Sequence, residues 1–364
     1  MKKILIIDNS TVIRNVIKNL FIDNQRIIIF EANSKEEAEE LIKKNSFFVV
    51  ISNLFLNDSS DSQMLELLKK QNIPTIIFSS TLESELLGKY SNIIDYVLKD
   101  SNGFKYIYKL VSAMEFCYKE KVLVIDDSVT ISTQIKEILE KLLLKVTIVE
   151  DGVKALEILN QEENFSLILS DYEMPNLNGL ELTRKIRSLN YYKNSPVIII
   201  TNSNQNDLKI EFYKHGANDI ILKPILQEEL ISKVINIFLN LKQIQEIKTF
   251  NHLIDKNVIT STTNTKGKIV SVSEAFCEIS GYTKEELLGK NHNILKHPDM
   301  PDSIYKELWE TISSGKVWKG ELKNLKKNGD YYWVNAVIEP SFSKEGKIVG
   351  YSSIRYDITD RKLI

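Results

Sequence analysis

Five polar side chains in the middle of the chain each follow a short apolar run that is typical of a buried strand. They are Asp126, Asp127, Asp171, Thr201 and Lys223. The carboxyl ends of strands in a parallel α/β sheet border the crevice where such folds bind ligands, so we expect these side chains to lie together. The sequence therefore predicts a site that combines three carboxylates, one hydroxyl and one ammonium group.

The chemistry of such a site follows from its charges. Three carboxylates in one place repel one another unless a hard divalent cation lies among them, and ligation by oxygen alone suits Mg²⁺. With that cation, the Thr201 hydroxyl and the Lys223 ammonium would neutralise a phosphoryl group transferred onto Asp171. The alternative is an ordinary domain whose strands merely end on polar residues, which requires all these positions to coincide by chance.

Four successive pairs of a strand and a helix must position these residues. The strand-like segments KVLVI, LILS and PVIIIT are nearly all apolar, as is typical of strands covered by helices on both faces. Alternation of such strands with helical segments predicts an α/β doubly wound parallel sheet over residues 119–240.

Residues 121–240 resemble the receiver domain of two-component response regulators, through the segments KVLVIDDS, LILSDYEMP and DIILKP. The resemblance implies a flavodoxin-like fold in which Asp171 is the phosphoacceptor and contributes to the metal site. It also implies that Asp127 binds Mg²⁺ directly, that Asp126 acts mainly through water, and that the Glu173 carbonyl completes the protein ligands.

The same resemblance assigns two catalytic positions and exposes two departures. Thr201 would follow the phosphoryl group with its hydroxyl, and Lys223 would pair with it. Ile220 stands where receivers usually have an aromatic switch residue, and Asn202 stands where they usually have a small residue. Phosphorylation is therefore expected, but the usual aromatic readout is not.

Residues 1–118 repeat the pattern of 119–240, which indicates two tandem copies of one domain. KILIIDNS matches KVLVIDDS, and VVISNLF matches LILSDYE, so Asn9 replaces a metal-binding acid and Asn53 replaces the phosphoacceptor. An amide is a poor nucleophile, so we expect a degenerate pseudo-receiver that serves docking or dimerisation, or else a stable spacer. Ser79 and Lys99 persist, and Tyr96 fills the aromatic switch position that is missing from the second copy.

Two helical patterns connect the domains. An apolar stripe within residues 104–118 predicts a buried helix with almost no linker after it. A second pattern extends past the receiver into 241–250, with apolar residues at alternating spacings of four and three, typical of a coiled coil. We expect a signalling helix that pairs with a second chain, or packing of the earlier positions on the receiver sheet. The positions are Leu230, Val234, Ile237, Leu241 and Ile244.

Residues 251–364 have a different character, because turn signals separate strand-like runs such as DYYWVNAVIEP and IVGYSSIRYDIT. One strand, a helical middle and three further strands predict an α+β domain with an antiparallel sheet. The stretch resembles a PAS sensor domain and ends in the usual exit motif, DITDRK.

The resemblance narrows to the PAS domain of the bacterial aerotaxis receptor, which holds FAD non-covalently. It rests on ISGYTKEELLGKNHNILKHPDMP and GKVWKGELKNLKKNGDYYWV. Lys296 stands where that family has arginine, and lysine lacks the planar fork that suits phosphate recognition. The alternatives are a PAS domain without a ligand, or haem held by His292 or His297. The resemblance assigns cofactor binding to His297, Asp299, Trp309, Asn324 and Trp333.

Composition limits the classes of function. A formal net charge of −2 and no Lys/Arg run give no reason to expect nucleic-acid binding, and no apolar stretch is long enough to enter a membrane. Cys117 and Cys277 lie far apart in apolar helical patterns, which is typical of reduced packing residues in a cytoplasmic protein.

The sequence therefore predicts a cytoplasmic phosphorelay protein and not a metabolic enzyme. A sensor histidine kinase or phosphotransfer protein would phosphorylate Asp171, and the chain would dimerise through the linker helix and the PAS domain. The expected domains are 1–118, 119–240, the linker 241–250, and 251–364. The main alternative is the regulatory part of a larger diguanylate cyclase or histidine kinase. A flavin redox enzyme is disfavoured because no proton relay is apparent.

Overall fold

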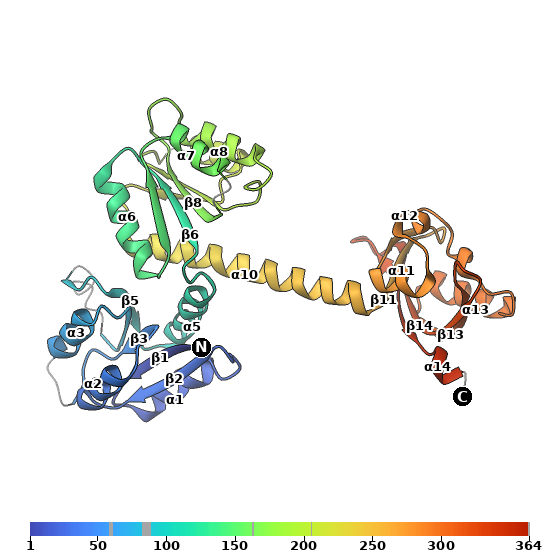
Figure 1. Cartoon of the computed structure of the whole chain (residues 1–364), viewed down its shortest axis with the longest axis horizontal. Coiled ribbons are helices and arrows are strands. Elements are labelled where there is room, and N and C mark those ends of the chain that lie inside the picture. Colours follow the sequence, from blue (N-terminus) through green and yellow to red (C-terminus); the bar gives the residue numbers. More distant parts are fainter. Residues whose placement is uncertain (58–60, 82–88, 162–163, 205, 363–364) are drawn as a thin grey trace. The chain divides into compact units, whose positions relative to one another are not determined.

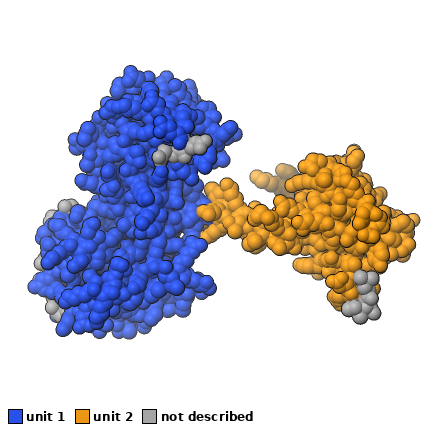
Figure 2. Space-filling model, viewed as in Figure 1, with its two compact units in different colours: residues 1–242 blue, residues 243–364 orange. Residues whose placement is uncertain are grey.

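The computed structural model describes residues 1–57, 61–81, 89–161, 164–204 and 206–362. These residues form two compact units, 1–242 and 243–364, which are blue and orange in Figure 2. The first unit contains two parallel sheets and the second contains one antiparallel sheet, which confirms the predicted fold class.

The first α/β domain is built on a five-stranded parallel sheet with the order β2-β1-β3-β4-β5. Figure 1 labels β1, β2, β3 and β5 of this sheet. Helices pack on this sheet, and its inner strands β3 and β4 are buried along their whole length. The strands are β1 Lys2–Ile7, β2 Ile27–Ala32, β3 Val49–Ser52, β4 Thr75–Ser79 and β5 Ile93–Leu98. The helices are α1 Thr11–Leu20, α2 Lys35–Lys44, α3 Asp61–Lys70 and α5 Ser101–Phe116.

The second α/β domain repeats this topology, because its sheet order β10-β9-β8-β6-β7 is the same order read from the opposite edge. This is the doubly wound, flavodoxin-like arrangement, whose ligands bind at the carboxyl ends of the strands. The strands are β6 Lys121–Ile125, β7 Lys145–Val149, β8 Phe165–Asp171, β9 Val197–Thr201 and β10 Asp219–Leu222. The helices are α6 Val129–Lys141, α7 Gly152–Asn160, α8 Gly179–Ser188 and α9 Asn206–Lys214.

The two α/β domains share one hydrophobic core, in which α5 and α6 both take part. The apolar stripe expected within 104–118 lies on α5 and is fully buried, which confirms that it is a core stripe. Because burying apolar surface is the main stabilising term in folding, this shared core fixes the two domains to each other. The buried residues of the stripe are Ile107, Leu110, Val111 and Met114.

A single helix, α10 Gln227–Asn257, follows the last strand of the second domain. Its first turns belong to the shared core, where Leu230 and Val234 are buried. These two positions of the expected coiled-coil pattern therefore pack on the α/β domain, the alternative left open by the sequence. Later in α10, large apolar side chains become exposed: Ile244, Ile247, Phe250 and Leu253.

The second unit contains a five-stranded sheet with the order β12-β11-β15-β14-β13, paired antiparallel throughout. Buried and exposed residues alternate along β14, as expected when one face of a sheet is covered. The strands are β11 Ile259–Asn264, β12 Ile269–Val272, β13 Trp318–Leu325, β14 Tyr331–Phe342 and β15 Ile348–Asp357. The helices are α11 Glu274–Ser280, α12 Lys284–Leu287, the 3₁₀ turn η1 His292–Leu295, α13 Asp302–Ser313 and α14 Thr359–Lys362.

Among the described residues, no helix combines the length and apolar character that crossing a membrane requires.

Candidate functional site

The strands of the second α/β domain bring the predicted polar residues to one edge of the sheet. Asp171 ends β8, Thr201 ends the neighbouring strand β9, and Lys223 follows β10. Asp126 and Asp127 follow β6, which pairs with β8 on its other side. The fold thus places all five residues at the carboxyl ends of adjacent strands, where the sequence located them.

The three carboxylates and the lysine form one cluster. Asp126, Asp127 and Asp171 each offer an oxygen, and these oxygens lie within 4.8 Å of one another. The Lys223 Nζ lies 3.0 Å from Asp171 Oδ2 and 3.3 Å from Asp126 Oδ2. Asp171 is only 3% exposed, and its Oδ1 is buried without a hydrogen-bond partner. Asp126 Oδ2 is also buried without a hydrogen-bond partner, although the Lys223 ammonium lies near it.

Local geometry fixes this cluster. The Ser128 backbone N–H donates to Asp126 Oδ1 at 2.8 Å, while the Ser128 side chain caps α6. On the other side, α8 begins at Gly179, where a Cβ atom would lie 2.5 Å from the Asp171 carbonyl oxygen. A glycine is therefore required for α8 to start so close to the end of β8.

The charges of the cluster are unbalanced. Burial raises the pKa of Asp171 and the nearby charge of Asp126 adds to this effect, while the hydrogen bond from Lys223 opposes it. Burial alone would lower the pKa of Lys223, but the two carboxylates outweigh burial and the pKa is raised. One ammonium therefore serves two buried carboxylates, and the exposed carboxylate of Asp127 adds more negative charge. Oxygen ligands with excess negative charge fit a hard divalent cation such as Mg²⁺.

The remaining predicted residues surround the cluster. The Thr201 hydroxyl is buried and accepts a hydrogen bond from the Ser203 N–H at 3.0 Å. Glu173 is exposed in the loop after β8, and its carboxylate accepts from Asn202 Nδ2 at 3.3 Å. Asn202 thus bonds to the loop that carries the expected metal-binding carbonyl, a contact that sequence reasoning missed. Ile220 is buried in the core of the second domain.

The equivalent place in the first α/β domain lacks this chemistry. Lys99 Nζ pairs with Asp8 Oδ2 at 2.6 Å, and the Asn53 amide donates to the Phe55 carbonyl at 2.6 Å. Asn53 Nδ2 also lies 3.5 Å from Asn9 Oδ1, so amides replace two of the acids. Among the described residues, only the second domain has a group of acidic side chains that could hold a metal ion.

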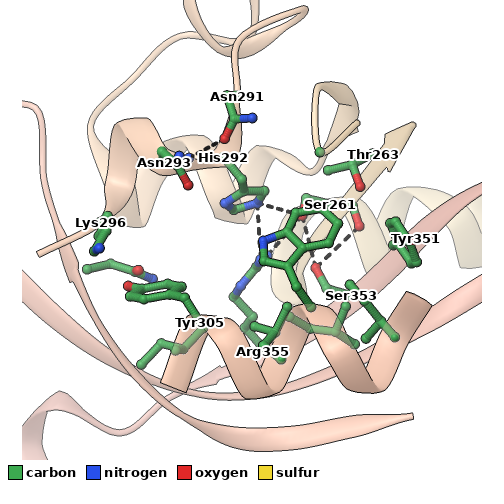
Figure 3. A pocket seen from close by; sticks show the side chains of 17 residues that line it. Ser261, Thr263, Asn291, His292, Asn293, Lys296, Tyr305, Tyr351, Ser353 and Arg355 are labelled. Atoms are coloured by element: carbon green, nitrogen blue, oxygen red, sulfur yellow. Dashed lines mark hydrogen bonds between the residues drawn. The ribbon is translucent and has the colours of Figure 1, made fainter. Parts of the chain in front are cut away.

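The second unit contains a pocket with a cavity volume of about 80 Å³ (Figure 3). Trp309 and Asn324 line it, as the expected cofactor site requires. His297, Asp299 and Trp333 are not among its lining residues. His297 lies edge-on to the Tyr331 ring, Asp299 accepts from Lys323 Nζ at 2.7 Å, and the Lys362 ammonium lies over Trp333.

The pocket also contains a buried polar group that sequence reasoning did not assign. Arg355, Ser261 and His292 are hydrogen-bonded to one another there (Figure 3). The signal was present in GYSSIR, because alternation along a strand places Tyr351, Ser353 and Arg355 on one face. The sequence offers His292 as a haem ligand or as a helix-capping or loop histidine, whereas in the structure its Nε2 lies 3.1 Å from both Arg355 and Ser261.

Comparison with known proteins agrees with this architecture. The model of the response regulator receiver domain matches residues 122–235, and that of the PAS fold matches 269–355. A two-component response regulator of Oryza sativa subsp. japonica is 38% identical over 104 residues, which cover 29% of this chain and 78% of that protein.

Two further likenesses cover other parts of the chain. The aerotaxis receptor of Escherichia coli (strain K12) is 43% identical over 111 residues, which make up 30% of this chain and 22% of the receptor. The chain thus spans about a fifth of that relative's length. The crystal structure of a two-component system response regulator/GGDEF domain protein superposes with a TM-score of 0.61 at 27% identity. It covers 66% of this chain and 100% of its own.

The chain belongs to the two-component response regulators, with a receiver domain followed by a PAS domain.

Proposed function

We propose that this response regulator accepts a phosphoryl group on Asp171 from a sensor histidine kinase or a phosphotransfer protein. The observation that carries the proposal is the acidic cluster beside Lys223, in which Asp171 Oδ1 is buried and without a partner. Asp126, Asp127, Asp171 and the Glu173 carbonyl would hold Mg²⁺, which supplies positive charge to a bound phosphoryl group.

The residues of the chain have separate parts in this reaction. Asp171 Oδ1 attacks phosphorus, the bond from phosphorus to the donor's imidazole nitrogen breaks, and the imidazole leaves with the electron pair. Lys223 lies close enough to pair with the phosphoryl oxygens as their charge arrives. The Thr201 hydroxyl, at the end of the neighbouring strand, donates to the same group once its side chain turns from Ser203.

The test is phosphorylation by a small acyl phosphate such as acetyl phosphate in the presence of Mg²⁺, followed by intact-mass measurement. We expect one phosphoryl group on the wild-type chain, none on Asp171→Asn, and none after removal of Mg²⁺ with a chelator. The matched control is Asp8→Asn, which removes the corresponding acid of the first domain and should leave labelling unchanged. Labelling of Asp171→Asn at the wild-type level would contradict the proposal.

The first α/β domain functions in this proposal as a pseudo-receiver that docks on the second. The domains extend over 1–118, 119–240, the linker 241–250 and 251–364. The protein acts in the cytoplasm as a phosphoacceptor and not as an enzyme. It forms a homodimer through the exposed apolar residues of α10, such as Ile247, and through the PAS domain, which analytical ultracentrifugation tests directly.

FAD is the ligand that the aerotaxis-receptor likeness supports, and the PAS pocket supplies side chains that suit an aromatic ring. Tyr305, Trp309 and Tyr351 supply aromatic walls, and Asn324 supplies a buried amide. A flavin would add redox sensitivity to the protein. The absorbance spectrum of freshly purified protein, with the released ligand identified after denaturation, tests this. No flavin in protein expressed with ample cofactor would contradict it. Haem is not proposed, since the His292 ring already bonds to Arg355 and Ser261.

A second candidate function is regulation of a signalling enzyme, which the likeness to a response regulator/GGDEF domain protein supports. No GGDEF-like segment occurs in these 364 residues, so the catalytic module would lie on a partner or a further part of the protein. Cyclic dinucleotide synthesis that appears only when phosphorylated protein is mixed with a candidate cyclase would support this function.

A further inference from the structure

The central strands of the PAS sheet present polar side chains where a purely structural core would be apolar. β11 and β15 are neighbours, with Ser261 opposite Ser353 and Ile259 opposite Arg355. Ser261, Ser353 and Arg355 are all buried, and they line the pocket (Figure 3). Polar residues at core positions are costly to folding unless they serve a function. The pocket wall therefore points to a ligand with matching polar groups.

Arg355 is the most unusual member of this wall. Only 4% of its surface is exposed, and its two terminal nitrogens donate to Ser261 Oγ at 3.0 Å and to His292 Nε2 at 3.1 Å. Its Nε is buried without a partner. The guanidinium carbon lies 5.3 Å from the centre of the Phe276 ring. Among the described residues, no carboxylate forms an ion pair with this guanidinium.

The charge of Arg355 is thus buried and uncompensated. Burial lowers its pKa to about 10, which still leaves the guanidinium protonated at neutral pH. Burial and the charge of Arg355 lower the pKa of His292 to about 3, so its imidazole is neutral and accepts the hydrogen bond. A buried cation without a counter-ion is strongly unfavourable, and proteins normally pair such a charge or neutralise it. The missing partner is an anion.

The pocket has room for that partner. Its cavity volume of about 80 Å³ is several times the ~10–15 Å³ that one water molecule needs, so a small anionic group can enter. The aromatic rings of Tyr305, Trp309 and Tyr351 form part of its walls. Lys296 also lines the pocket, but its ammonium pairs with Asp302 and lies 4.8 Å from the centre of the Tyr305 ring. The buried guanidinium, and not the lysine, therefore carries the unpaired charge.

We propose that Arg355, held in place by its hydrogen bonds to Ser261 and His292, binds an anionic oxygen group of a small ligand inside the PAS pocket. The planar fork of a guanidinium matches a carboxylate or a phosphate, which accept two parallel hydrogen bonds. Two sources can supply such a group: a free organic carboxylate, or the phosphates of FAD. Anion binding in the PAS pocket is independent of phosphorylation at Asp171, and the experiment below does not measure phosphorylation.

The test uses the purified full chain after exhaustive dialysis, with thermal unfolding of the PAS domain as the readout. Sodium acetate, malonate and succinate are the free-carboxylate probes, FAD is the cofactor probe, and sodium chloride at equal ionic strength is the reference. The variants are Arg355→Gln and Arg355→Lys. Lys319→Gln, which removes an exposed cation from β13, is the matched control.

We expect at least one probe to raise the unfolding temperature of wild type and of Lys319→Gln by several degrees. Arg355→Gln should lose that shift, and Arg355→Lys should need at least tenfold more ligand, because lysine cannot form the bidentate pair. A response to free carboxylates identifies an organic acid as the source, and a response to FAD alone identifies the cofactor. Without any probe, Arg355→Gln should unfold at or above the wild-type temperature, because it removes an unpaired buried charge.

Two results would overturn the inference. The first is that no probe stabilises the wild-type PAS domain, or that Arg355→Gln responds as wild type does. The second combines two observations. Without ligand, Arg355→Gln unfolds at a lower temperature than wild type and Arg355→Lys unfolds at the wild-type temperature. With each probe, both variants show the same shift in unfolding temperature as wild type. That pattern would show that Arg355 has only a structural role.

Discussion

The side chains around Asp171 carry excess negative charge, so this site attracts a cation. Asp126 and Asp171 are both buried, and they share the ammonium of Lys223. The pKa of Asp171 is raised, so its ionised form is less favourable in the folded protein than in the unfolded chain. Ionised Asp171 therefore lowers stability at neutral pH, and this cost disappears as the pH falls through the raised pKa.

Replacing Asp171 by asparagine should consequently stabilise the first unit when Mg²⁺ is absent. We expect Asp171→Asn to raise its unfolding temperature at pH 7 by about 2–4 °C, the shift that ~1 kcal/mol produces in a unit of this size. The gain should shrink as the pH falls towards the acid range. Differential scanning calorimetry at several pH values measures it, with the exposed Asp23→Asn as control. A lower unfolding temperature at pH 7 would show that the carboxylate is stabilising.

The sequence predicted the acidic cluster of the receiver domain better than the pocket of the PAS domain. The acids, the threonine and the lysine of the receiver each follow an apolar run, so their shared place at one sheet edge could be inferred from strand order alone. Arg355 could not be assigned in this way. Its significance depends on the folded pocket, in which no acid among the described residues pairs with it, and not on the segment GYSSIR.

Among the elements, α10 combines two functions in one continuous helix. The spacing of Leu230, Val234 and Ile244 is equally suited to packing on a sheet and to pairing with another helix, so periodicity alone could not separate them. Burial separates them in the structure: the first two lie in the shared core, whereas Ile244 is exposed. The sequence predicted the helix, and only the packing of the domains showed where its buried part ends.

The first turn of α10 also connects the two α/β domains. Gln227 Nε2 donates to the Ile94 carbonyl of β5 at 2.8 Å, and Gln227 Oε1 accepts from Lys141 Nζ at 2.8 Å. This residue follows Lys223 closely in sequence, so it links the chain next to the acidic cluster to the first domain.

We expect Gln227→Ala to weaken the attachment of the first domain. The substitution leaves the Ile94 carbonyl without this donor, which should lower the free energy of unfolding of the first unit by about 1 kcal/mol. Urea denaturation followed by far-ultraviolet circular dichroism measures the loss. The matched control is Gln243→Ala, at an exposed position of the same helix. Equal stability of the two variants would mean that the bond between α10 and β5 contributes nothing.

At the scale of the whole molecule, the shared core predicts how the chain unfolds. The two α/β domains have a common hydrophobic core through α5 and α6, whereas residues 243–364 form a compact unit of their own. Internal repetition revealed the two copies in the sequence. That they share one core could not be inferred, because an apolar helix stripe does not show which surface covers it.

Calorimetry of the full chain should therefore show two transitions, one for each unit. Leu110→Ala removes a fully buried side chain of α5 and should destabilise the first unit by about 2–5 kcal/mol. Both α/β domains should shift together in this variant, while the PAS transition stays in place. Unfolding of the first domain alone, with the second unchanged, would contradict a shared core.

Identification of the phosphorylated residue is the most direct test of Asp171 as the phosphoacceptor. The wild-type chain is phosphorylated with acetyl phosphate and Mg²⁺, the acyl phosphate is trapped by borohydride reduction, and the modified peptide is sequenced by mass spectrometry. We expect modification at Asp171 and none at Asn53. The double variant Asn53→Asp/Asp171→Asn should carry no label, because Asn9 still replaces a metal ligand. Modification of any residue other than Asp171 would contradict the proposal that Asp171 accepts the phosphoryl group.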